Sequence, residues 1–411
     1  MVGPVTSPKP ALWLTAKRLR AHGLILALSL WSVYTWNIST PGLLDRAGNL
    51  KGTDFLHFYT LGSLALAHGG AGLYNLEAQS ALAAQRVPAA AGIRYLPLYP
   101  PQVSIFLAPF ARLSYPGALI LWLAFSALLY CLCCYTVWRA CPNLRNRKLT
   151  VLILALAFPA FWHLIAWGQT SALALVCFTL AFFALRARRE FLAGLALGCL
   201  IFKPQLALAA ALVFVITLNW KVMGGAILSA AAQLTVARLY YGPGPLRDWI
   251  HMLSNVRSLL PLLEPRPYQT HSLRTFWTML IPWPSTALAL YLITALLVAA
   301  TTIACWRSRL PLSVRYSALL FATVLLAPHL TVYDLVILTP AFLLLSDWII
   351  TQPDQPTTPY LKVLLYLAFV LPLFGPLARW THLQLSVPVM AALLYGIWNL
   401  GRKSIPVPNS L

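Results

Sequence analysis

Long apolar runs constrain this chain more than any other feature of its sequence. Runs of roughly 18 or more apolar residues recur between residues 24 and 400, and each is long enough for a helix that crosses a bilayer. The runs are continuous rather than alternating, which favours helices over a β-barrel. Only 9% of the residues are charged, against about 25% in soluble domains. We therefore predict an all-α, polytopic transmembrane bundle that forms a single domain over residues 1–411.

The order of the runs predicts about twelve spans. The expected spans cover residues 24–37, 117–138, 149–165, 171–185, 191–202, 205–218, 222–239, 286–306, 316–327, 335–350, 361–377 and 385–400. The run at 103–113 is too short to cross and is interpreted as interfacial or re-entrant. The arginine clusters then fall on the same side as both chain ends, which the positive-inside rule assigns to the cytoplasm.

This topology predicts two external loops. The first covers residues 38–115, with interfacial helices near 55–67 and 76–85, and the second covers residues 240–272. No cleavage site of small residues follows the first apolar run, so we expect an anchored first helix rather than a cleaved signal.

The net charge of +21 and the seven cysteines bear on the class of function. The basic residues stand in short clusters between apolar runs, which indicates helix orientation rather than nucleic-acid binding. Cys131, Cys133 and Cys134 lie inside an apolar run with no histidine or acid nearby, so packing is favoured over metal binding or a disulfide. The sequence has no P-loop, H-E-x-x-H helix or G-x-S-x-G elbow, which argues against ATP-driven transport and zinc proteolysis.

Asp54 is the strongest candidate for a catalytic group. It is one of only nine acidic residues, and it lies in the first polar loop beside Phe55, His57 and Tyr59. Aromatic neighbours suit a sugar or a lipid head group, and they desolvate a carboxylate and strengthen it as a base. A helix cap or a pairing with Lys51 is the structural alternative. We predict that Asp54 is a catalytic base and that His57 and Tyr59 bind substrate.

Three basic residues are candidates for binding a phosphate. Lys203 lies between two apolar runs, where a lysine costs about 2.5–3.5 kcal/mol, and Pro204 breaks the helix there, as in ligand-binding broken helices. Snorkelling of Lys203 to the interface is the alternative. His329 has no evident capping role, so contact with an anionic group is favoured. Arg274 either pairs with a phosphate or anchors the interface.

Four further residues are candidates for substrate contact. Gln169 either forms the polar tip of a turn or contacts a ligand hydroxyl. Asp334 follows Thr331 by three residues, a spacing typical of a helix N-terminus, so capping is weighed equally with substrate contact. Tyr99 and Tyr333 stand beside polar segments that are expected on the external face.

Several motifs occur together in an order that resembles a known family. They comprise residues 53–59, 67–70 with 73–74, 99–101 with 108–109, 168–169, 193–198 with 203–204, and 327–329 with 333–334. The set is similar to the GT-C glycosyltransferases, and specifically to glycosyltransferase family 87, the polyprenol-phosphate-mannose-dependent mannosyltransferases. The resemblance implies a multi-span fold, inversion at the anomeric carbon and a catalytic aspartate in the first external loop, at Asp54. It also implies that Lys203 and His329 lie near the donor phosphate.

Together these observations predict an inverting glycosyltransferase of the cytoplasmic (inner) membrane with its active site on the external face. The expected donor is a polyprenyl-phosphate-linked sugar, either mannose or another hexose or pentose, and the expected acceptor is a lipid or a glycan. Membrane lipids are expected partners and nucleic acid is not. No cofactor is expected, because few external carboxylates could hold a metal, although a divalent cation is left open. A secondary transporter or lipid flippase, and a surface-polymer ligase or acyltransferase that uses a lipid-linked donor, are the alternatives.

Overall fold

The computed structural model describes residues 14–255, 264, 266–352 and 357–403. The protein is 79% helical, and the described residues form no strand, only isolated bridges between Leu44 and Leu50 and between Thr270 and Thr331. The prediction of an all-α fold is confirmed.

The helices follow one another along the whole described chain. The α-helices are α1 (Ala16–Ile38), α2 (Thr53–Leu66), α3 (Leu76–Arg86), α4 (Gln102–Leu107), α5 (Tyr115–Arg139), α6 (Lys148–Ala157), α7 (Pro159–Trp167), α8 (Ser171–Arg186), α9 (Glu190–Gly198), α10 (Leu208–Ile216), α11 (Trp220–Tyr241), α12 (Gly244–Ser254), α14 (Leu273–Leu280), α15 (Pro284–Arg307), α16 (Leu312–Leu326), α17 (Thr339–Ile350), α18 (Thr358–Val370), α19 (Ala378–Thr381) and α20 (Ser386–Lys403). The 3₁₀ helices are η1 (Gly70–Gly72), η2 (Pro88–Ala90), η3 (Phe110–Arg112), η4 (Pro142–Arg147), η5 (Cys199–Phe202), η6 (Pro204–Ala207), η7 (Pro267–Gln269), η8 (Val332–Leu338) and η9 (Leu371–Leu377).

Several of the described helices are long and apolar enough to cross a membrane. Five meet this condition by length and composition: Tyr115–Arg139, Trp220–Tyr241, Pro284–Arg307, Val332–Ile350 and Thr358–Thr381. A sixth is obtained if the pair Pro142–Ala157 and Pro159–Trp167, which is bent by 47°, is one broken span. Pro159 accounts for the bend, because proline has no backbone N–H to continue the helix. Four shorter apolar helical segments also fall on expected spans, so the total of about twelve stays a prediction.

Glycines allow α9 and α11 to pack closely. α9 packs against α11, and a Cβ atom added at Gly194 would lie 2.1 Å from the carbonyl oxygen of Val222. From the other side, a Cβ atom at Gly225 would lie 2.2 Å from the carbonyl oxygen of Phe191. Membrane helices approach this closely through small residues, so Gly194 and Gly225 fix the distance between α9 and α11.

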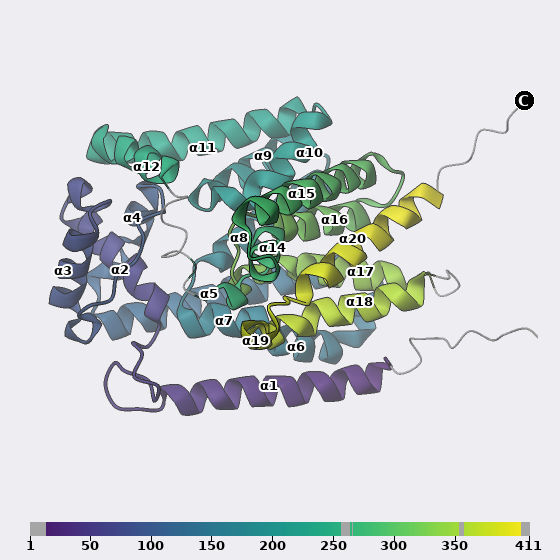
Figure 1. The fold of residues 1–411 in the computed structure, drawn as a ribbon, viewed down its shortest axis with the longest axis horizontal. Helices are drawn as coiled ribbons and strands as arrows, with labels where there is room; N and C mark the ends of the chain where they lie inside the picture. Colours follow the sequence, from purple (N-terminus) through teal and green to yellow (C-terminus); the bar gives the residue numbers. More distant parts are fainter. Residues whose placement is uncertain (1–13, 256–263, 265, 353–356, 404–411) are drawn as a thin grey trace, which may run out of the picture.

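Different helices lie at the two ends of the bundle. Figure 1 shows α2, α3, α4 and α12 gathered at one end, beyond the C-terminal end of α1, while the start of α1 and the end of α20 lie at the other. The segments expected near 55–67 and 76–85 are α2 and α3, and most side chains of α2 are buried in the fold. The run at 103–113 forms only α4 and η3. The expected loop at 240–272 includes α12 and η7, while its residues 256–263 and 265 lie outside the described part of the chain.

Candidate active site

A cavity of about 480 Å³ brings together residues from distant parts of the chain. Eight of the ten site residues expected from the sequence line it: Asp54, His57, Tyr99, Gln169, Lys203, His329, Tyr333 and Asp334. Tyr59 and Arg274 do not. The carboxylate expected to be a base and two of the groups expected to bind phosphate therefore share one space.

Asp54 is held in the first turn of α2. The helix begins after Gly52, which has a left-handed conformation (φ 65°) that glycine adopts without strain. Phe55 stacks on Trp122 of α5 with ring centroids 5.9 Å apart, which anchors this turn to the bundle. Burial raises the pKa of Asp54 to about 6, while a hydrogen bond from Gln169 and the charge of Lys203 act in the opposite direction. At neutral pH the group is thus an ionised carboxylate with the basicity that suits proton removal.

Gln169 orients the Asp54 carboxylate. Its Nε2 atom donates to Asp54 Oδ2 at 2.5 Å. The preceding Gly168 has φ 71°, and its carbonyl oxygen accepts from the indole Nε1 of Trp122 at 2.8 Å. The side chain expected to mark a polar turn therefore contacts the candidate base.

Lys203 and Asp334 form a buried ion pair at the wall of the cavity. Lys203 Nζ lies 2.7 Å from Asp334 Oδ1, and the two side chains are 5% and 2% exposed. Ser171 Oγ accepts from Lys203 at 3.0 Å and donates to Asp334 Oδ1 at 2.5 Å. Asp334 also caps η8, because its Oδ2 accepts from the backbone N–H of Thr331 at 3.2 Å. The capping alternative for Asp334 thus describes only half of its contacts.

Glu264 pairs with two of the residues that were expected to bind phosphate. Its Oε1 accepts from His329 Nδ1 at 2.7 Å and forms an ion pair with Arg274. Arg274 also donates to the carbonyl oxygen of Pro328. Burial raises the pKa of Glu264, but the hydrogen bond from His329 and the charge of Arg274 outweigh it and hold that pKa below its ordinary value. Arg274 lies behind Glu264 rather than on the cavity, so it can act on a ligand only through Glu264 and His329.

His57 is buried in the cavity wall and has no hydrogen-bond partner among the described residues. It is 4% exposed, and neither ring nitrogen has a partner in the part of the protein that the structure describes. The ring lies 5.3 Å from that of Tyr95 and 5.8 Å from that of Tyr99 between centroids. Burial lowers the pKa of His57 to about 4, so the imidazole is neutral at pH 7 and offers one donor and one acceptor. An unpaired buried polar group is costly, and a ligand hydroxyl would satisfy it.

The tyrosines expected to contact substrate take different positions. Tyr59 Oη donates to the carbonyl oxygen of Leu113 and accepts from Arg86 Nη2, both at 2.9 Å, so it braces the α2 end away from the cavity. Tyr99 and Tyr333 line the cavity, and the Lys203 ammonium lies 5.1 Å from the centre of the Tyr333 ring.

Two arginines on the cavity were not identified as site residues from the sequence. Arg94 and Arg266 line it and are exposed, and neither forms an ion pair within the described ranges. No spacing or motif marks them, because each lies in an irregular segment. Their charges, unlike that of Lys203, are not offset by a carboxylate of the described chain.

A comparison with protein families decides the class of this protein. The model of glycosyltransferase family 87 matches residues 98–328, more than half of the chain. The chain belongs to glycosyltransferase family 87. No curated protein and no solved structure gives a match to the chain. The resemblance seen in the sequence is thereby confirmed at the level of the family.

The family 87 match covers part of the cavity. Tyr99, Gln169 and Lys203 lie within the matched residues, whereas Asp54 lies before them and His329 follows directly after them. Among the described residues, no group of three or more His, Cys, Asp and Glu side chains is placed to hold a metal ion. The metal independence expected from the sequence stays a prediction.

Proposed function

We propose that this family 87 member is an inverting glycosyltransferase that moves one sugar from a polyprenyl-phosphate-linked donor to a hydroxyl of a lipid or glycan acceptor. The observation that carries the proposal is the shared cavity, which is lined both by the Asp54 carboxylate and by Lys203, His329, Arg94 and Arg266. Glycosyl transfer with inversion needs a base and a leaving-group site in one cavity, on opposite faces of the sugar.

Asp54 acts as the general base. The acceptor hydroxyl gives its proton to Asp54 while its oxygen bonds to the anomeric carbon, and the bond from that carbon to the phosphate oxygen breaks. The electron pair leaves with the polyprenyl phosphate. A positioned base contributes about 10²–10⁴-fold, and the hydrogen bond from Gln169 sets the orientation of the carboxylate. A phosphate leaving group needs no general acid, so one carboxylate suffices.

The departing phosphate needs positive charge that the protein has not already compensated. A phosphodiester donor carries one negative charge and leaves as a monoester with nearly two. Lys203 is paired with Asp334, and His329 with Glu264, so these two residues share their hydrogen bonds with carboxylates. Arg94 and Arg266 carry no such partner in the described chain and line the same cavity. We assign them, together with Lys203 and His329, to the phosphate, since stabilising the developing charge is usually the largest catalytic contribution.

The sugar and the acceptor bind beside the base. His57 follows Asp54 by one helical turn, and its unpartnered ring nitrogens suit a hydroxyl of either substrate. Tyr99 and Tyr333 provide apolar ring faces on the lining of the same cavity. The apolar helices and the family support a position in the membrane, and we propose the cytoplasmic membrane with the cavity facing outward and no metal in the reaction.

The test is Asp54→Asn, assayed in nanodiscs with a radiolabelled polyprenyl-phosphate sugar and a mixed acceptor extract. Asparagine keeps the shape and removes the base, so we expect turnover to fall by about 10²-fold or more. Asp45→Asn is the matched control, because Asp45 accepts from the backbone of Ala47 and Asn49 within the same loop and does not line the cavity. Turnover of the Asp54 variant at the wild-type rate would remove Asp54 from the mechanism.

The same assay separates this activity from the alternatives. Mass analysis of the product is expected to show the addition of one sugar residue. Transfer of a whole polymer or an acyl group would instead indicate a ligase or acyltransferase. Uptake of donor into proteoliposomes without product would indicate transport.

A further inference from the structure

A second cavity, of about 430 Å³, shares no lining residue with the one that contains Asp54. It is lined by residues from the start of α1 and from α5, η4, α6, α17 and α18. These elements meet at the end of the bundle where α1 begins, whereas α2 with Asp54 lies beyond the other end of α1 (Figure 1). Asp334 lines the catalytic cavity and Thr339 lines this one, so η8 (Val332–Leu338) separates the two.

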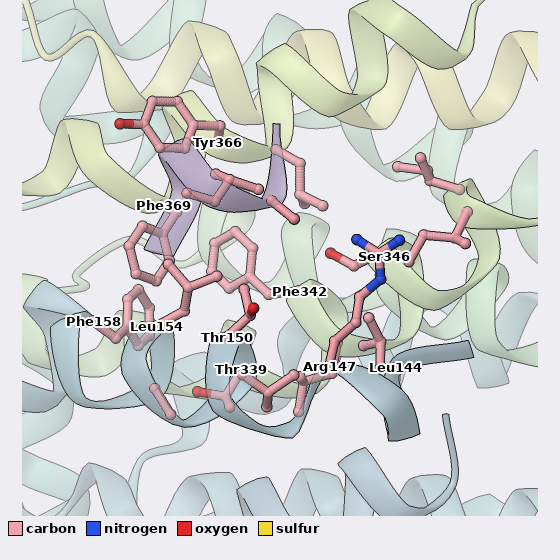
Figure 2. Close-up of a pocket in the computed structure, with 18 of the residues that line it drawn as sticks. Leu144, Arg147, Thr150, Leu154, Phe158, Thr339, Phe342, Ser346, Tyr366 and Phe369 are labelled. Carbon is pink, nitrogen blue, oxygen red and sulfur yellow. The ribbon is translucent and has the colours of Figure 1, made fainter. Parts of the chain in front are cut away.

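The lining of this cavity is apolar along its length and cationic at its edge. Leu154, Phe158, Phe342 and Phe369 provide the apolar wall (Figure 2). Arg147, the last residue of η4, and Lys362, in the first turns of α18, provide two positive charges. Figure 2 shows the Arg147 side chain extending toward Ser346.

Neither positive charge is compensated by an acidic side chain of the described chain. Arg147 and Lys362 form no ion pair among the residues that the structure describes, and no acidic residue is part of the described lining. The nearest acid along α17 is Asp347, whose Oδ1 accepts from the backbone N–H groups of Asn143 at 2.7 Å and Leu144 at 3.1 Å. The carboxylate of Asp347 thus caps the start of η4 and leaves the edge of the cavity positive.

The charged edge and the apolar wall of the cavity match the two parts of a lipid, its phosphate and its acyl chains. α17 and α18 belong to the candidate spans Val332–Ile350 and Thr358–Thr381, and Lys362 lies close to the start of the second of these. Positive side chains at the ends of spans meet lipid phosphates, whereas the apolar wall lies where acyl chains run. An apolar space of this size filled only with water would be unfavourable.

We propose that this cavity binds one anionic glycerophospholipid, with its phosphate against Arg147 and Lys362 and an acyl chain along Leu154, Phe342 and Phe369. The bound lipid fills the space between α1 and α18, which are otherwise joined by the hydrogen bond between His22 and Tyr366 at 2.9 Å. The site is separate from the catalytic cavity. The proposal therefore does not depend on which sugar the enzyme transfers.

Native mass spectrometry of the full chain, released from detergent with added phosphatidylglycerol or phosphatidylcholine, tests this site. We expect one phosphatidylglycerol molecule to be retained, and the variant Arg147→Gln/Lys362→Gln to lower its apparent affinity at least about tenfold. Arg145→Gln/Lys148→Gln is the matched control, because it removes the same amount of charge from positions beside Arg147, but neither residue lines the cavity. This control is expected to bind as the wild type does.

A second variant tests the apolar wall without changing charge. Leu343→Trp fills the cavity from α17 and should abolish retention of the lipid, while the elution profile and glycosyl transfer report that the protein is folded. Equal retention by the Arg147/Lys362 variant and its control would overturn the proposal. Equal retention of phosphatidylcholine, or competition by inorganic phosphate alone, would also overturn it.

Discussion

The ion pair between Lys203 and Asp334 offers a direct test of how the catalytic cavity is held together. Lys203→Met keeps a long side chain and removes the charge. Asp334 then retains hydrogen bonds from Ser171 Oγ and the backbone of Thr331, but it has lost its ion-pair partner. Solvent replaces that partner poorly, because the two side chains are only 5% and 2% exposed.

The magnitude follows from this burial. Removing one partner of a buried ion pair costs about 3–5 kcal/mol, and the two remaining hydrogen bonds place Lys203→Met near the lower end of that range. The double variant Lys203→Met/Asp334→Asn removes both charges. The amide oxygen introduced at position 334 can still accept from the backbone N–H of Thr331. We therefore expect the double variant to recover at least half of the lost free energy of unfolding.

Unfolding in mixed micelles of mild detergent and dodecyl sulfate measures these differences. Lys51→Met is the matched control, because Lys51 donates to the carbonyl oxygens of Thr40 and Gly42 and its loss leaves no carboxylate unpaired. Equal unfolding free energies for the single and double variants would refute the argument from an unpaired buried charge. Wild-type turnover by the folded double variant would separately remove Lys203 from stabilisation of the leaving phosphate.

Three further predictions concern the residues that line the catalytic cavity. The pH–rate profile of kcat/KM should fall about tenfold per pH unit below about pH 6, because the pKa of Asp54 is raised to about 6 and only its ionised form accepts a proton; a flat profile down to about pH 4.5 would contradict this. Arg94→Gln and Arg266→Gln should each raise the donor KM by roughly fivefold to tenfold in a donor titration, whereas Arg112→Gln, an exposed arginine that does not line the cavity, should leave it unchanged. His57→Phe should lower kcat/KM by roughly 10–100-fold with little change in Tm, because its ring nitrogens have no protein partner in the described chain to lose; a large fall in Tm at unchanged rate would instead assign His57 to packing.

Two features of the sequence alone identify residues of the cavity: the scarcity of acidic residues and the cost of burying a lysine. One carboxylate among aromatic residues drew attention to Asp54, and a lysine between apolar runs drew attention to Lys203, and both line one cavity. What the sequence could not provide is pairing between distant side chains. Asp334 and Lys203 are 131 residues apart, and nothing in either local pattern predicts their contact.

Helical geometry explains the different placements of two residues in α2. A helix turns by about 100° per residue, so His57 lies about 60° round the axis from Asp54, whereas Tyr59 lies about 140° away. His57 accordingly lines the cavity, and Tyr59 bonds to Leu113 and Arg86 on the other side. The sequence predicts this helix at 55–67, which leaves Asp54 outside it, so the distinction needs the observed start of α2 at Thr53. The ion pair between Arg274 and Glu264 is not predicted from the sequence either, because Glu264 lies in an irregular segment ten residues before Arg274.

Gly168 has no Cβ atom, which lets its backbone pack directly against Phe55. A Cβ atom there would lie 2.8 Å from Cβ of Phe55, on the turn of α2 that carries Asp54. The hydrogen bond from Trp122 Nε1 to its carbonyl oxygen holds the backbone of Gly168 in place. A side chain at this position would therefore push α2 outward and move Asp54 away from Gln169. The position of the Asp54 carboxylate relative to an acceptor hydroxyl therefore depends on the close approach of the Gly168 backbone to Phe55, which only a residue without a side chain allows.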